Sequence, residues 1–330
     1  MFISAVELRK DPITRSWVIT GDETGAERVD SGECAYCQGQ KRYQLISSVP
    51  GEIWSAAAVV HPNPLYRIEG DTSRVADGIY DKMQSVGAHE VLLENPQHDR
   101  HLWQADEAEI SAFLKLAAQR VSDLKRDRRF KYVTVFKNQG VAAGQESEHP
   151  HSQLTATTFV PRRVLYELRS GREYYARKER CVFCDMMQQE LKQGKRIVEA
   201  TAEWVASCPY AARVPYETWI MPREHEAYFE RNMLARPAAV RGLATALRRT
   251  LQRVRSITPD FHMVLHTTPN TQHRSEALDY WKTIDEDYHW HIEILPIIGG
   301  RAKSYTLKET YFSTVSPERA AERLREAAVN

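Results

Sequence analysis

The residues of this chain best suited to chemistry lie in one short run, His149-Pro150-His151-Ser152-Gln153. In an extended strand, side chains two residues apart point the same way, so His149, His151 and Gln153 would line one face. A nucleophilic imidazole needs its attacking nitrogen unprotonated and its other nitrogen held by a hydrogen-bond acceptor. The amide of Gln153 could donate to a phosphoryl oxygen as charge shifts during transfer. The run therefore predicts covalent phosphoryl chemistry through a histidine.

Two glycines, Gly140 and Gly144, precede this run. Glycine lets the backbone approach a phosphate closely, so we expect both to lie in the phosphate site. The alternative is a pair of histidines with satisfied hydrogen bonds and no catalytic role. The glutamine two residues after His151 and the glycine-rich approach favour catalysis.

Cysteines form a second set of candidates. Four of the five stand in two C-x-x-C pairs, Cys34 with Cys37 and Cys181 with Cys184. This spacing lets two thiolates share one tetrahedral ion, and reduced cytosolic cysteines favour metal ligation over disulfides. The remaining ligands must come from distant segments, so the pattern is not that of a zinc finger. Two reduced pairs without metal are the alternative, and Cys208 is expected to be a buried small hydrophobe.

The elements that would position these residues occur twice in the same order. Each half has a C-x-x-C pair, an apolar strand-like run, a proline shortly before a histidine, an amphipathic helix, a β-rich run and a His-x-His. The matched landmarks are Pro96-Gln97-His98 with Pro222 to His225, Ile110 to Val121 with Val240 to Leu251, Tyr132 to Phe136 with His262 to Leu265, and His149 to Leu154 with His289 to Ile294. We therefore predict an α+β fold of two fused repeats, residues 1–165 and 166–330, followed by a C-terminal helix that Ser316 caps.

Bulk properties exclude several classes of partner. The chain has 330 residues, with 45 Lys and Arg against 44 Asp and Glu, a net charge of +1. Such balance gives no general reason to expect nucleic acid or an anionic membrane as partner. The N-terminus has no apolar signal region, and no stretch approaches the roughly 18 apolar residues of a membrane span. We expect a soluble, cytoplasmic protein.

Four motifs together resemble the galactose-1-phosphate uridylyltransferase family of the histidine triad superfamily. They are E-L-R-K-D-P from Glu7, Y-D-K-M to G-A-H-E-V between Tyr80 and Val91, F-K-N-Q-G from Phe136, and H-P-H-S-Q from His149. The resemblance runs from about Val6 to Ala328. It implies a duplicated histidine-triad fold with an antiparallel sheet and flanking helices in each repeat, usually in a homodimer.

The resemblance also implies an activity in carbohydrate metabolism, galactose metabolism first. A nucleoside monophosphate, most simply UMP, would move by ping-pong transfer between a sugar nucleotide and a sugar 1-phosphate. By motif match His151 is the nucleophile and Gln153 supports the phosphoryl group. Asn138 and Ser152 would lie in the nucleotide-phosphate site.

Metal ligands follow from the same resemblance. His98 and His149 would join Cys34 and Cys37 around a structural zinc, fixing the strand that carries His151. By the repeat, Cys181, Cys184, His225 and His289 would hold a second zinc, giving two per chain. An alternative set in the family, matched here by Glu167, His266, His289 and His291, holds iron. The two sets share His289, so they exclude one another as complete sites, and the thiolates favour zinc.

The resemblance weakens around the substrate. An Arg-rich stretch that faces the phosphates in the family is reduced to Arg28 between Thr20 and Glu33. The segment from Lys308 to Phe312 lacks a glutamine that contacts the hexose, and a later glycine-rich loop is shortened to Ile298-Gly299-Gly300-Arg301. The sugar and the base stay open, so an adenylyltransferase of the ADP-glucose phosphorylase type is the main alternative. A nucleotide hydrolase and a non-catalytic nucleotide-binding protein are weaker ones.

Overall fold

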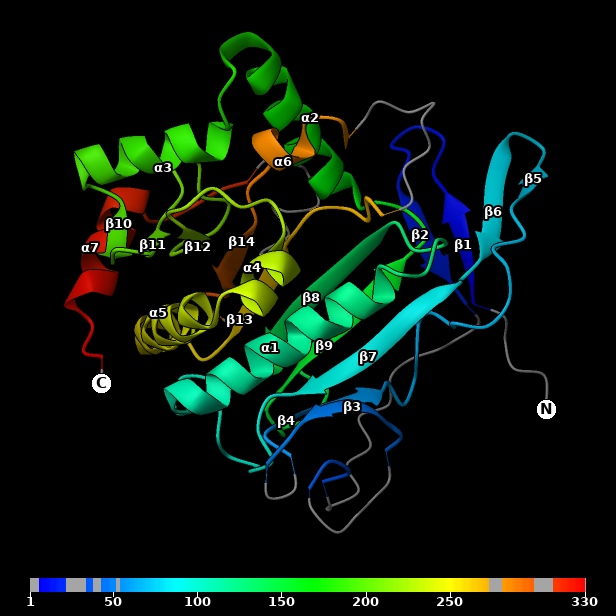
Figure 1. The fold of residues 1–330 in the computed structure, drawn as a ribbon, viewed down its shortest axis with the longest axis horizontal. Helices are drawn as coiled ribbons and strands as arrows, with labels where there is room; N and C mark the ends of the chain where they lie inside the picture. The colour runs from blue at the N-terminus through cyan, green and yellow to red at the C-terminus, as the bar shows by residue number, and fades with distance from the viewer. Residues whose placement is uncertain are drawn as a thin grey trace.

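A ten-stranded antiparallel sheet forms the centre of the computed structural model (Figure 1). The structure describes residues 6–21, 34–37, 43–51, 54–272, 281–299 and 311–329. From one edge to the other, the strands of the large sheet are β10 (Ile197–Ala200), β11 (Trp204–Ser207), β12 (Thr218–Pro222), β14 (His291–Pro296), β13 (Phe261–His266), β8 (Tyr132–Gln139), β9 (His151–Thr157), β7 (Gly87–Leu93), β4 (Ala56–Val60) and β3 (Leu45–Val49).

The strand order confirms the predicted duplication. Counted outward from the centre, the first half supplies β8, β9, β7, β4 and β3, and the second half supplies β13, β14, β12, β11 and β10. The two sets join because β8 pairs with β13, with Gln139 opposite Phe261. The expected sheet of each repeat is therefore half of one continuous sheet. The division at residues 165 and 166 stays a prediction, and it falls within helix α2 (Arg162–Lys178).

Helices cover both faces of the sheet. On one face α1 (Glu107–Leu124) packs against α5 (Pro237–Ile257) and α4 (Phe229–Ala235), and α7 (Pro317–Glu326) packs against α5. α1 begins at a capping box formed by Asp106 and Glu109. On the other face of the second half lie α2, α3 (Val182–Gln193) and α6 (Ile284–Asp287), whose apolar side chains form a separate core with Trp219 and Met221. The predicted cap at Ser316 is confirmed, since its side chain accepts from the Arg319 N–H.

Strand alternation decides which residues are available for chemistry. Leu154 and Ala156 of β9 point into the core under α1 and α5, as do Ile292 and Ile294 of β14. Because side chains alternate, the intervening residues of β9 and β14 point to the opposite face. The histidines at the start of both strands therefore lie on the face away from α1.

A smaller four-stranded sheet stands beside the first half, ordered β2 (Trp17–Thr20), β1 (Glu7–Lys10), β6 (Tyr80–Gln84) and β5 (Val75–Asp77). It packs through Leu8, Met83 and Tyr66, with Trp17 against Phe159 at the end of β9. A single 3₁₀ turn, Val141–Ala143, follows β8. Among the described helices, none has the length and apolar character needed to cross a membrane.

Candidate active site and metal centres

His151 is the first residue of β9, and its tautomer is fixed by a hydrogen bond. Its Nδ1 lies 2.7 Å from the carbonyl oxygen of His149, so Nδ1 carries the hydrogen and donates it. Nε2 has no hydrogen-bond partner among the described residues and keeps its lone pair. Burial, aided by the positive Lys137, lowers the pKa of His151 to about 4. The ring is therefore neutral at physiological pH with one nitrogen free to attack.

A buried ion pair behind β9 holds the His151 backbone. Lys137 Nζ donates to the His151 carbonyl at 2.9 Å and to both oxygens of Glu94 at 3.0 Å. The Ser152 hydroxyl donates to Glu94 at 2.7 Å and is fully buried. This side chain points away from His151 and Gln153 because alternate residues of a strand face opposite ways. The prediction that Ser152 lies in the phosphate site is thus corrected for its side chain, which supports the strand.

The amide of Gln153 is oriented by His89 of β7. His89 Nδ1 accepts the Leu65 N–H at 3.1 Å, so the ring hydrogen must be on Nε2. That nitrogen lies 2.9 Å from Gln153 Oε1 and donates to it. With its oxygen occupied, Gln153 presents its NH₂ group to the surroundings as a donor. Sequence analysis missed this role of His89, although the G-A-H-E-V motif contains it.

Two further residues reach this face, and sequence analysis singled out neither of them. His61 stacks on His89 with ring centroids 3.9 Å apart. Its Nδ1 accepts the Asn63 N–H, so Nε2 donates to Glu146, 2.9 Å away. The hydrogen bond from His61 outweighs burial and lowers the pKa of Glu146, with smaller contributions from Gln153 and His151. A carboxylate three residues before His149 is thus linked to Gln153 through the stacked rings of His61 and His89.

Of the other three predicted phosphate-site residues, Asn138 and Gly140 have local partners. Asn138 Oδ1 lies 2.9 Å from His262 Nδ1, across the junction between the two halves. Gly140 has φ of 87°, and a Cβ there would lie 2.0 Å from Asp260 Oδ1, so packing against Asp260 already requires this glycine. Gly144 has φ of 74° with nothing within 4 Å of a Cβ, which leaves open space at that turn.

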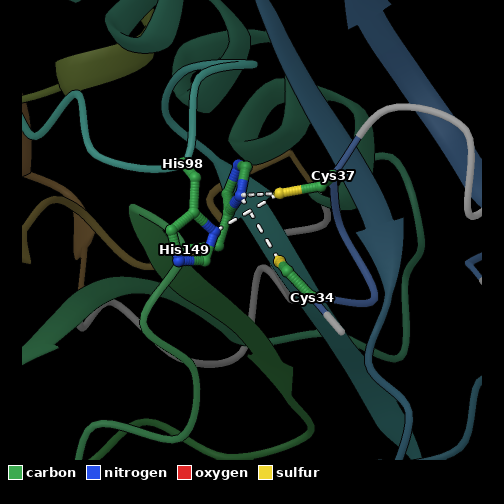
Figure 2. Close-up of side chains that lie close together, drawn as sticks. All are labelled: Cys34, Cys37, His98 and His149. Carbon is green, nitrogen blue, oxygen red and sulfur yellow. Dashed lines mark hydrogen bonds between the residues drawn. The ribbon is translucent and has the colours of Figure 1, made fainter. Parts of the chain in front are cut away.

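The first metal cluster joins all four predicted ligands (Figure 2). Cys37 Sγ lies 3.3 Å from His98 Nδ1, and His149 Nδ1 lies 3.7 Å from both Cys34 Sγ and Cys37 Sγ. His149 Nε2 donates to the Asn95 carbonyl at 2.9 Å, so its Nδ1 lone pair faces the sulfurs. With zinc–sulfur bonds of about 2.3 Å and zinc–nitrogen bonds of about 2.0 Å, a tetrahedral site separates sulfur and nitrogen by roughly 3.5 Å. The donor set fits a tetrahedral ion.

The second cluster repeats this arrangement with Cys181, Cys184, His225 and His289. Cys184 Sγ lies 3.2 Å from His225 Nδ1 and 3.4 Å from His289 Nδ1. The Nε2 atoms of both rings donate to carbonyls, those of Asp285 and Pro222. Such a bond on the outer nitrogen is the usual support of a metal-ligating histidine.

Known proteins match the whole of this architecture. A family model for the N-terminal domain of galactose-1-phosphate uridyl transferase matches residues 65–161. Galactose-1-phosphate uridylyltransferase of Thermotoga maritima is 26% identical over 98% of this chain and 99% of its own length. ADP-glucose phosphorylase of Arabidopsis thaliana is also 26% identical, over 98% of this chain and 93% of that protein. A solved uridylyltransferase structure superposes with a TM-score of 0.80 at 25% identity, over 97% of this chain and 98% of that one.

The chain therefore resembles the galactose-1-phosphate uridylyltransferase family over nearly its whole length. The family fold, two histidine-triad repeats in one chain, agrees with the strand order described above.

The predicted iron-ligand set of Glu167, His266, His289 and His291 needs correction. Glu167, His266 and His291 do lie together, but their fourth member is Glu293, with all ligand atoms within 4.8 Å of one another. His289 lies with the thiolates instead, because it precedes β14 and its Nδ1 is 3.4 Å from Cys184 Sγ, whereas His291 and Glu293 share one face of that strand. The second thiolate cluster and the Glu/His cluster are therefore complete at the same time, and the prediction that they exclude one another is wrong.

Charges within the Glu/His cluster are balanced by side chains. Arg213 Nη2 lies 2.6 Å from Glu293 Oε2, and Arg163 Nε lies 3.0 Å from Glu167 Oε1. Burial opposes protonation of His266, but Glu167 and Glu293 outweigh it and raise the pKa of His266 to about 10. These ion pairs do not satisfy the whole cluster, since Glu167 Oε1, Glu293 Oε1 and His291 Nε2 are buried without a hydrogen-bond partner.

The predicted substrate contact Arg28 lies outside the described residues. So do residues 308–310 of the segment that lacks the family's hexose-contacting glutamine.

Proposed function

We propose that this protein is a nucleotidyltransferase that moves a nucleoside monophosphate between a sugar nucleotide and a sugar 1-phosphate. His151 is the nucleophile and Gln153 the phosphoryl donor. The observation that carries this proposal is the hydrogen bond from His151 Nδ1 to the His149 carbonyl, which leaves a neutral Nε2 beside the Gln153 amide.

In the first half-reaction His151 Nε2 attacks the phosphorus that carries the nucleoside. The bond from that phosphorus to the bridging oxygen breaks, and the sugar 1-phosphate leaves with the electron pair. Because Nδ1 keeps its hydrogen, the ring becomes a phosphorylated imidazolium, which the His149 carbonyl stabilises. The NH₂ of Gln153 donates to the phosphoryl oxygens. In the second half-reaction the oxygen of another sugar 1-phosphate attacks, and His151 leaves as a neutral imidazole.

Zinc at the two thiolate clusters would have a structural role, with about two ions per chain. At the first cluster Cys34, Cys37, His98 and His149 would hold it, which ties the chain two residues before His151 to distant segments. Neither cluster needs an open coordination position for this role.

UMP transfer is the first candidate because most of the named relatives are uridylyltransferases. Adenylyl transfer is the second candidate, since the Arabidopsis ADP-glucose phosphorylase matches nearly the whole chain at the same identity as the Thermotoga enzyme. A homodimer in the cytoplasm completes the proposal.

A labelling experiment tests the nucleophile and the base together. The protein is incubated separately with UDP-glucose and ADP-glucose labelled at the nucleoside phosphorus, then denatured and digested. We expect one nucleotide to remain on the peptide that contains His151. His151→Gly should retain no label, and added imidazole should restore some turnover by taking the place of the ring. Label on the His291 peptide, or none on the wild-type protein, would contradict the proposal.

A further inference from the structure

Glu146 has no role in the transfer described above, yet it stands in the same site. Sugar 1-phosphates attack as oxyanions, so neither half-reaction needs a base to remove a proton. A carboxylate near the reacting phosphoryl group repels such acceptors. Glu146 is joined to Gln153 through His61 and His89, and a carboxylate at this place calls for a different acceptor.

The surroundings of Glu146 hold it in a fixed, ionised form. His61 is 4% exposed and its Nε2–H donates to Glu146 Oε2 at 2.9 Å. His61 Nδ1 accepts the Asn63 N–H, so the ring hydrogen is on Nε2 and His61 acts as a fixed donor. The ring is clamped further by stacking on His89. A carboxylate can accept about four hydrogen bonds, so one from His61 leaves room for a proton donor.

The Glu146 side chain is 41% exposed, so water and small hydroxyl compounds can reach it. It projects from the turn after Gly144, where the structure is open. Successive contacts thus join Glu146 to His61, His61 to His89, and His89 to Gln153 on the face that carries the nucleophile.

We propose that Glu146, positioned by His61, is a general base that lets water discharge the nucleotidyl-His151 intermediate, giving the enzyme a hydrolytic activity besides transfer. Water attacks the phosphorus and a new phosphorus–oxygen bond forms. The bond from phosphorus to His151 Nε2 breaks, its electron pair returns to the ring, and the proton of water passes to Glu146. The product is a free nucleoside monophosphate, and Glu146 returns its proton to solvent. The proposal rests on the proposed function, because it needs the same intermediate.

The test isolates the second half-reaction. Labelled nucleotidyl-enzyme is prepared from UDP-glucose or ADP-glucose, freed of substrate by rapid desalting, and left in buffer. We expect the wild-type label to be released as nucleoside monophosphate, more slowly in D₂O than in H₂O. Glu146→Gln should release it on the order of 10²-fold more slowly, the usual effect of losing a general base. Discharge to added glucose 1-phosphate should slow far less, since an oxyanion needs no base.

Two variants sharpen the result. Glu148→Gln changes an exposed carboxylate in the same segment and should decay at the wild-type rate. His61→Phe keeps a ring that can stack on His89 but cannot donate to Glu146. This variant should hydrolyse the intermediate more slowly than wild type and should still react more slowly in D₂O than in H₂O. Equal decay of Glu146→Gln and wild type in buffer would overturn the proposed base while leaving the transfer mechanism intact. No label retained even by Glu146→Gln, whose intermediate should last longest, would overturn both.

Discussion

The His89 ring and the Gln153 amide are locked to one another across the neighbouring strands β7 and β9. His89 Nε2 lies 2.9 Å from Gln153 Oε1, and the Leu65 N–H on the opposite ring nitrogen leaves only one tautomer. A glutamine amide can otherwise turn over and exchange its oxygen for its nitrogen. This contact keeps the donor group of Gln153 available to a phosphoryl oxygen.

Replacing His89 with phenylalanine should therefore slow nucleotidylation. The ring would still stack on His61, but Gln153 would lose its fixed orientation. Loss of a phosphoryl donor costs about 10²-fold or more, so a misoriented donor should cost up to about 10²-fold. Rapid-quench labelling of His151 measures this rate directly. We expect the reduction in the labelling rate with little change in the substrate concentration at half-saturation. An unchanged labelling rate would show that Gln153 needs no positioning.

His89 also makes the stability of the protein depend on pH. Burial, together with the neighbouring His61, lowers the pKa of His89 from 6.5 to about 4. Between pH 6.5 and 4, His89 is protonated in the unfolded chain but stays neutral in the folded chain. The free energy of unfolding therefore falls as the pH drops through this range. One such group adds a slope of at most about 1.4 kcal/mol per pH unit in that window. Denaturant unfolding of wild type and His89→Phe at pH 7, 5.5 and 4.5 should show a shallower decline in the variant. Parallel declines would mean that His89 titrates normally.

Much of the site could be predicted because its pattern is local. The H-P-H-S-Q run and the two C-x-x-C pairs place nucleophile, donor and thiolates within a few residues of one another, and the repeat pairs distant histidines with them. His61 and His89 could not be found that way, since they reach Gln153 only through the pairing of β4, β7 and β9. Period-two alternation along β7 was the available signal, because His89 shares a face with Val91 and Leu93.

Two predictions made by motif match needed correction. Ser152 was placed in the site by motif match, but strand alternation turns its hydroxyl to Glu94. His289 was also assigned to two ligand sets at once, but it lies before β14 with its Nδ1 3.4 Å from Cys184 Sγ, away from the pair of His291 and Glu293. The pairing of β8 with β13, which joins the two halves, could not be predicted from the sequence either. No local sequence pattern indicates which edge strands of two sheets will pair.

Zinc should be lost selectively when one thiolate is changed. Cys34→Ser should remove about one zinc per chain and lower the melting temperature, because metal binding at a structural site contributes to folding. Cys208→Ser is the matched control, since Cys208 is fully buried and belongs to neither cluster. Elemental analysis and thermal unfolding of the two variants make the comparison. A Cys34→Ser protein with the zinc content and melting temperature of wild type would remove the structural role.

The kinetic order follows from a nucleophile that holds the nucleotide between substrates. His151 has a single free ring nitrogen, so the first sugar phosphate must leave before the second attacks the same phosphorus. Initial rates at several fixed acceptor concentrations should give parallel double-reciprocal lines. The enzyme should also exchange labelled glucose 1-phosphate into UDP-glucose or ADP-glucose with no second sugar nucleotide present. Gln153→Glu should slow both half-reactions alike, by on the order of 10²-fold, because a carboxylate replaces the donor at the same phosphoryl oxygens. Intersecting lines without exchange would instead indicate direct transfer in a ternary complex. His151 would then serve as a base or a binding residue, and its free Nε2 would need a different explanation.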